Sequence, residues 1–192
     1  MIAVTRGIRY ATLMTLRTIE RFAANNAWSN LRLLRACSGL SAEAFAAPRT
    51  SFFPSLTETM NHILIVDWYY LDGLEGGGRG LACFESDIPF PELPALAAEQ
   101  QAADRRLIAF VNALSAADLE TTVTLQRTGR VLVETVGDTL LHLFTHQIHH
   151  RGQAHAMLAG TDVKPPPLDE FFMSADLELR AEELKELGLP LA

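Results

Sequence analysis

The sequence predicts an all-α protein built as a helical bundle, and two features of the 192-residue chain indicate this class. Apolar residues recur at helical spacing in four long segments, and the breaks between these segments contain glycine and proline. The one stretch rich in β-branched residues is only long enough for a short hairpin. Because no internal repeat is found, we expect a single domain over residues 1–192, with a core at about 5–160 and a C-terminal extension at 161–192.

The first two long helices are predicted in the N-terminal part of the chain. A helix at about 5–37 is indicated by apolar residues at Ile8, Leu13, Leu16, Ile19, Phe22, Leu31 and Leu34. Gly39 favours a stop, and Ser41 can cap a short helical turn that Pro48 closes. The second helix is expected to begin near Pro54, because proline suits a first turn, and to run to about Leu71.

Residues 72–94 form a long connection that is rich in glycine and proline. Its "GGGRG" is not a phosphate-binding loop, because no Gly-Lys-Ser/Thr follows and no strand pattern precedes it. Connections of this length are uncommon in compact domains and are either functional or mobile. Two interpretations follow from the residues, a plain crossover linker and an active-site flap.

The second half of the chain predicts two more long helices with a hairpin between them. The third helix is expected at about 95–114, with its buried face at Leu96, Leu107, Phe110, Val111 and Leu114. β-branched residues on both sides of "RTGR" indicate a short hairpin before the fourth helix. The fourth helix should start at Glu134 or Thr135 and run to Leu158, with Gly160 ending it. "KPPP" at 164–167 breaks the chain before a short helix near 175–187.

Composition and charge exclude several classes of protein. With 16 basic and 23 acidic residues the net charge is −7, which repels phosphate backbones, so we expect no nucleic-acid partner. Arginines interrupt the apolar N-terminus, and the longest apolar runs are far too short to span a bilayer, so neither a signal peptide nor a membrane partner is expected. Cys37 and Cys83 are too few for a disulfide framework and are typical of reduced thiols in a cytoplasmic protein.

Five of the six histidines lie on the predicted fourth helix, in "HLFTHQIHHRGQAH". The helix has its apolar face at Leu140, Leu143, Phe144, Ala154 and Leu158. His146 and His150 border this face one turn apart and can converge on one cation, as histidines at i and i+4 do in zinc sites. His62, in the middle of the second helix, can supply a third ligand if the second and fourth helices pack together.

Spacing alone leaves other interpretations of these histidines open. A lone histidine on a helix is usually a packed or exposed residue without a ligand, and this applies to His62. The cluster on the fourth helix can also be an incidental solvated stripe. His142 and His149 are rotated further from the apolar face, and His155 points about 180° away from His146.

Several segments resemble the DinB (damage-inducible) family of four-helix-bundle proteins. "LLHLFTHQIHHRGQAHAML" is similar to the signature helix of this family, and "HxxxHRGQ", from His146 to Gln153, is its most specific part. "SFFPSLTETMNHILIVDWYYLDGL" resembles the second helix of the family, and "NNAWSNLRLLRACSGLSAEAF" its first. The resemblance covers about residues 15–160 and implies four helices running up-down-down-up. That order requires a long crossover between the second and third helices, which favours the linker interpretation of residues 72–94.

The resemblance implies a divalent metal, with zinc or nickel as the leading candidates, held by three histidines. Carried over by position these are His62, His146 and His150. His149 and Gln153, and more weakly His142, are candidates for groups that support the ligands. No role is assigned to His155, and Arg151 is expected to be a structural ion-pair or cap partner rather than an anion binder.

The family includes enzymes that use low-molecular-weight thiols, so the resemblance implies a metal-dependent S-transferase acting on a small electrophile with a thiol cosubstrate. The alternatives are a metal-dependent hydrolase and a stress-related metal- or ligand-binding protein without turnover. Glu58, one turn before His62, is a weak candidate for a base or a ligand-orienting group, against its interpretation as an exposed helix glutamate. A homodimer is expected, because family members often pair.

Overall fold

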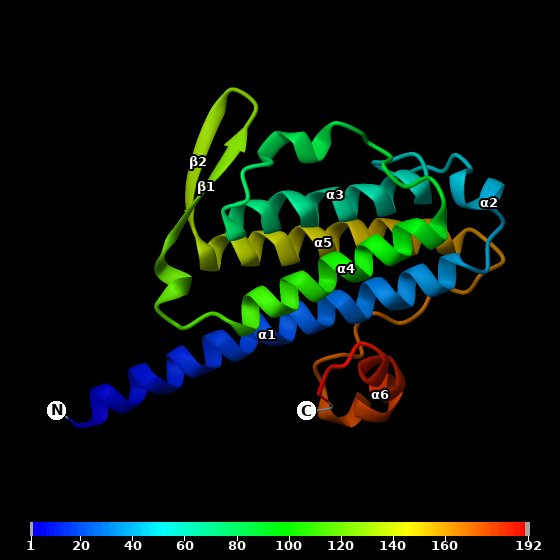
Figure 1. The fold of residues 1–192 in the computed structure, drawn as a ribbon. Coiled ribbons are helices and arrows are strands. Elements are labelled where there is room, and N and C mark those ends of the chain that lie inside the picture. The colour runs from blue at the N-terminus through cyan, green and yellow to red at the C-terminus, as the bar shows by residue number, and fades with distance from the viewer. Residues whose placement is uncertain (1, 191–192) are drawn as a thin grey trace.

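The structure is a computed structural model that describes the backbone of residues 2–190 and the side chains of residues 15–190. Four long helices form the molecule: α1 (Ile2–Cys37), α3 (Leu56–Glu75), α4 (Leu93–Asn112) and α5 (Val136–Ala159) (Figure 1). The remaining elements are short: α2 (Ala42–Ala46), α6 (Leu177–Glu186), the 3₁₀ turns η1 (Gly80–Phe84), η2 (Asp118–Glu120) and η3 (Ser174–Asp176), and the strands β1 (Thr122–Arg127) and β2 (Arg130–Thr135).

The four long helices are arranged as an up-down-down-up bundle, as the sequence predicts. Helix α1 packs on α4 and α5, and α3 packs on the same two helices. Figure 1 shows α1 and α5 running in one direction and α3 and α4 in the other. Because α3 and α4 are parallel, residues 76–92 must return along the length of the bundle, and this segment contacts α3 and β1 through η1. The segment is therefore the crossover linker.

The helix boundaries follow local capping chemistry. The second predicted helix begins at Leu56 rather than near Pro54, because the Ser55 hydroxyl accepts a hydrogen bond from the backbone N–H of Glu58 at 3.1 Å. The same hydroxyl donates to the Glu58 carboxylate at 3.1 Å, which completes a reciprocal N-terminal cap. Helix α3 continues past Leu71 to Gly76, whose positive φ of 70° forms a left-handed C-cap.

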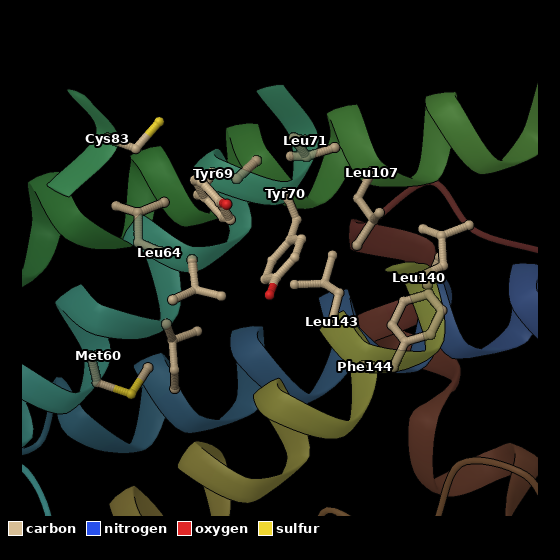
Figure 2. Close-up of a cluster of buried hydrophobic side chains, with 14 of the residues drawn as sticks. Met60, Leu64, Tyr69, Tyr70, Leu71, Cys83, Leu107, Leu140, Leu143 and Phe144 are labelled. Atoms are coloured by element: carbon tan, nitrogen blue, oxygen red, sulfur yellow. The ribbon is translucent and has the colours of Figure 1, made fainter. Parts of the chain in front are cut away.

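The apolar core joins all four long helices, and Figure 2 shows part of it, including Leu64, Leu107 and Leu143. All five residues of the predicted apolar face of α5 are buried, and so are the predicted Leu96, Leu107 and Val111 of α4. The predicted Ile8 and Leu13 of α1 lie outside the described side chains.

The β-hairpin packs against the C-terminal half of α3. Val123 and Leu125 of β1 point into the core, while the Tyr69 hydroxyl donates to the Gln126 carbonyl at 2.6 Å. A methyl group at Gly73 would lie 2.3 Å from Leu125 Cδ2, so the absence of a side chain there permits this close approach. The predicted "RTGR" turn connects the two strands, which pair from Thr122↔Thr135 to Arg127↔Arg130.

A buried polar layer lies inside the bundle and takes residues from all four long helices: Asn26, Asn30, Asp67, Gln100, Asp104, Gln147 and Arg151. Arg151 donates to the side-chain oxygens of Asn26 and Asn30, and Asn30 donates to the Asp104 carboxylate at 2.9 Å. Burial raises the pKa of both Asp67 and Asp104, and the Arg151 charge opposes these shifts. Arg151 is thus a buried cation whose hydrogen bonds go to two asparagine side chains, rather than to the ion-pair or cap partner expected from the sequence.

The C-terminal segment folds back on α1. Trp28, Phe171 and Leu184 form a small second cluster, and the Arg32 guanidinium lies 3.1 Å from the Glu183 carboxylate. Among the described helices, none combines the length and the apolar character needed to cross a bilayer.

Candidate metal centre

Three histidines converge at the seam between α3 and α5, and we call them the histidine triad: His62, His146 and His150. One ring nitrogen from each lies within 4.8 Å of the other two, and the Nε2 atoms of His62 and His146 are 3.2 Å apart. Two nitrogens bound tetrahedrally at about 2.05 Å to one zinc ion would be about 3.3 Å apart. The structure therefore brings together the three residues that the resemblance implies.

The packing of α5 on α3 places the triad through the residues next to the ligands. The buried amide of Gln147, directly after His146, donates to the carbonyl oxygen of Ile63 at 2.9 Å, and Ile63 directly follows His62. The same Nε2 donates to the Asp67 carboxylate at 2.5 Å. The bond to Ile63 joins residues that directly follow two of the ligands. Together the two bonds fix how α5 is positioned along the axis of α3.

Burial keeps the triad histidines neutral. Loss of solvation lowers the pKa of His62 to about 4 and that of His146 to about 3, and the neighbouring triad rings contribute in the same direction. The pKa of His150 is also lowered by burial, while its bond to Gln153 opposes this. A neutral imidazole has a lone pair on one nitrogen, which is the form that binds a metal. The donor set at pH 7 is therefore three neutral imidazoles.

Gln153 links the triad to His149 on the exposed side of α5. Its Oε1 lies 2.9 Å from Nδ1 of His150, and its Nε2 lies 3.0 Å from Nε2 of His149. An amide oxygen only accepts, so Nδ1 of His150 carries the hydrogen and Nε2 of His150 keeps the lone pair. Gln153 thus selects the tautomer of His150, and His149 contacts the triad through Gln153 and through its ring, centred 4.9 Å from that of His150.

The other sequence candidates lie at the edge of the site or away from it. His142 is exposed, with its ring centred 5.4 Å from Tyr70 and 6.4 Å from His146. His155 lies 3.0 Å from the Pro166 carbonyl oxygen, so the C-terminal segment holds it. The Glu58 carboxylate accepts the Ser55 hydroxyl in the α3 cap.

Nδ1 of His146 is buried and has no hydrogen bond of normal geometry, and the same is true of Oε1 of Gln147. The Gln147 side chain is near enough to oppose in part the lowering of the pKa of His146. A ring whose second nitrogen lacks a firm partner is less tightly oriented than that of His150. The position of the His146 ring thus depends on the contact of its Nε2 atom with His62 and on packing.

Two aromatic residues that helical spacing does not point to lie beside the triad: Phe52 and Phe53, in the irregular segment before α3. The Phe53 ring centre lies 4.3 Å from that of His62 and 5.6 Å from that of His150. The Phe52 ring lies 6.3 Å from His150 and is 75% exposed. Their signal in the sequence was the pair of adjacent aromatics in "SFFP", directly before the helix that carries His62.

A groove of about 860 Å³ lies elsewhere, between α1, α4 and the C-terminal segment. A smaller cavity of about 290 Å³ adjoins it and shares Arg17, Arg21 and Phe172. No triad histidine lines either of them.

A comparison with known protein families assigns the chain to one of them. The DinB family model matches residues 14–183, which is most of the chain. The chain belongs to the DinB family. The residues that carried the resemblance, from His146 to Gln153 on α5, lie inside this match together with His62.

Solved structures agree with the DinB assignment at the level of the fold. A DinB-like protein from Bacillus cereus ATCC 10987 superposes with a TM-score of 0.58 at 18% sequence identity, over 76% of this chain and 94% of the other. Among curated proteins, none matches the chain. The DinB bundle is therefore established for this protein by its sequence and its structure.

Proposed function

We propose that this DinB protein binds one divalent metal ion through the histidine triad and uses it to activate a thiol for transfer to a small electrophile. The convergence of three neutral imidazoles within 4.8 Å supports the metal part of the proposal most strongly. Neutral nitrogen donors without a carboxylate suit zinc and nickel, and copper and iron accept them as well. We take zinc or nickel as the candidates.

The triad fits such an ion in its donor chemistry. The 3.2 Å between the Nε2 atoms of His62 and His146 matches two ligands of one tetrahedral ion. Three protein ligands are the number found in catalytic zinc sites, in which one position remains for substrate or water. A bound metal of this kind lowers the pKa of a coordinated thiol and so supplies a thiolate at neutral pH.

The residues of this chain have separate tasks in the proposed reaction. Gln153 holds His150 in the tautomer whose Nε2 lone pair faces away from the amide. Phe53 packs on the ring of His62, 4.3 Å away between centres. With a thiolate supplied in this way, its sulfur would attack the electrophilic carbon, a sulfur–carbon bond would form, and the leaving group would depart with its electron pair. Glu58 is not needed as a base in this scheme, because the thiol proton passes to solvent.

Metal analysis followed by a thiol-consumption screen tests the proposal. Purified protein should contain close to one equivalent of zinc or nickel per chain, and His150→Ala should contain none. The metal-loaded protein should then consume a small thiol, such as 2-mercaptoethanol, faster in the presence of 1-chloro-2,4-dinitrobenzene than His150→Ala does. A wild-type protein that stays metal-free after exposure to both ions refutes the metal site. A metal-loaded protein that hydrolyses p-nitrophenyl acetate and consumes no thiol favours the hydrolase alternative.

A further inference from the structure

Phe52 is an unusual feature of the surface beside the histidine triad. At 75% it has the largest exposed fraction of the large apolar side chains that are exposed in the described part of the chain, ahead of Met173 at 65%. A phenyl ring gains free energy when it is taken out of water, and this exposed ring lies next to a candidate reaction centre.

The two phenylalanines extend the triad outwards as a continuous aromatic wall. Phe53 lies against the ligand rings, 4.3 Å from His62 between centres. Phe52 packs edge-on against Phe53, with centres 4.9 Å apart and planes at 84°, and lies 6.3 Å from His150. The wall thus begins at the ligand nitrogens and ends at an exposed ring, which leaves apolar surface for a bound molecule.

The segment that carries the wall is anchored at its base. The Arg49 backbone N–H donates to the Pro54 carbonyl at 2.6 Å, which closes the segment on itself. The Arg49 guanidinium donates to the carbonyls of Ala44 and Ala47 at 2.6 and 2.8 Å, and this ties the segment to the end of α2. Ser55 fixes the other end as the cap of α3. The exposure of Phe52 is therefore a property of an anchored segment.

The wall itself offers a ligand aromatic surface, because both of its side chains are phenyl rings. A planar apolar group can stack on the exposed ring, and such aromatic pairs add stability beyond the area that they bury.

We propose that Phe52 and Phe53 form a binding subsite for a planar apolar group, such as an aryl group, on the small molecule that reacts at the triad. This inference rests on the proposed metal function and adds the substrate class to it. Phe52 acts as a specificity-determining residue that touches the substrate, and Phe53 supports it while it packs on His62. The subsite selects compounds with an aryl group over smaller polar ones.

The test compares two probes on cobalt-loaded protein, imidazole and 4-phenylimidazole, which bind the metal through the same type of nitrogen. Binding is followed by the visible absorption of cobalt. Wild type should bind 4-phenylimidazole more tightly than imidazole, and Phe52→Ala should reduce this preference roughly tenfold while the imidazole Kd and the cobalt content stay unchanged. Phe52→Tyr should restore the preference. Phe172→Ala is the matched control, because Phe172 is 37% exposed and lies in the C-terminal segment.

The outcomes separate this inference from the proposed function. A cobalt-loaded wild type with equal affinity for the two probes overturns the subsite alone. The same holds if Phe52→Ala weakens both probes equally, or if it changes the molecular mass in solution instead, which would assign Phe52 to contact with a second copy. A wild type that binds no cobalt overturns the metal function and the subsite with it. Circular dichroism checks that each variant is folded.

Discussion

Replacing Gln147 with Met tests whether the hydrogen bonds beside the ligands hold the histidine triad together. Gln147 is fully buried and donates to the Ile63 carbonyl and the Asp67 carboxylate. The bond to the carboxylate contributes about 1.5–3 kcal/mol and the neutral one about 1 kcal/mol. Met has a similar length, and it removes the buried Oε1 atom that lacks a hydrogen bond of normal geometry. Removing this unpaired atom regains about 1 kcal/mol or more and so offsets part of the loss. We expect a net loss of about 1–3 kcal/mol in the free energy of unfolding of metal-free protein.

The same change should weaken metal binding about 10–100-fold, because it loosens the register between His62 and His146. Urea unfolding in the presence of a chelator measures the first effect, and competition with a chromophoric chelator measures the second. Gln153→Leu is the matched control: Gln153 contacts His150 and His149 but bonds to no other helix, so it should weaken metal binding and leave the urea midpoint almost unchanged. If Gln147→Met unfolds at the wild-type urea midpoint and binds metal normally, the proposed coupling between register and ligand geometry is wrong.

Three other predictions concern the remaining histidines, the buried polar layer and the assembly. Each triad histidine changed to Ala should abolish metal retention, whereas His155→Ala should keep one equivalent and His142→Ala or His149→Ala should weaken binding at most about 10–100-fold. Metal stoichiometry measured on all six single variants decides this, and loss of metal in His155→Ala would contradict it. Because burial raises the pKa of Asp104 in the folded protein, its carboxyl group loses the proton at a lower pH in the unfolded chain than in the folded one. The free energy of unfolding contributed by Asp104 therefore falls as pH rises from about 4 towards the folded pKa. Asp104→Asn should therefore flatten the decline of stability over this window in urea titrations at several pH values, and identical profiles would refute the assignment. Finally, the chain should be at least a dimer at micromolar concentration by light scattering, with Ile148, which is 50% exposed on α5, as a candidate contact, and a monomeric mass would end this prediction.

The sequence predicted the order of the elements because each one carries its own local signal. The hairpin followed from β-branched residues around "RTGR", and the long helices from their apolar spacing. Helix α3 starts after the predicted Pro54, because the cap that Ser55 provides, and not the proline, sets its first turn. The expected dimer follows from the family resemblance and not from a local pattern, so the sequence predicts no contact surface for it.

Only those residues of the candidate site could be predicted that helical geometry or the family resemblance indicates. His146 and His150 share a row on one helix, so their convergence follows from spacing, whereas the role of His62, the one histidine outside that helix, came from the family resemblance. Phe52 and Phe53 were missed because they lie in an irregular segment, where no periodicity indicates direction. The partners of Arg151 were missed as well, because Asp67 and Asp104 lie on two other helices and only tertiary packing brings them within its electrostatic reach.

The specificity of the "HQIHHRGQ" motif can be understood from three adjacent rows on α5, each made of residues four apart. His146 and His150 face the seam with α3 and offer the ligand nitrogens. The row of Gln147 and Arg151 is rotated about 100° from it and enters the buried polar layer, where it bonds to α3 and α1. The row of His149 and Gln153, about 60° to the other side, sets the tautomer of His150 from the surface. One short stretch thus specifies the ligands, the helix register and the ligand orientation, so a shift of the motif by one residue would disrupt all three together.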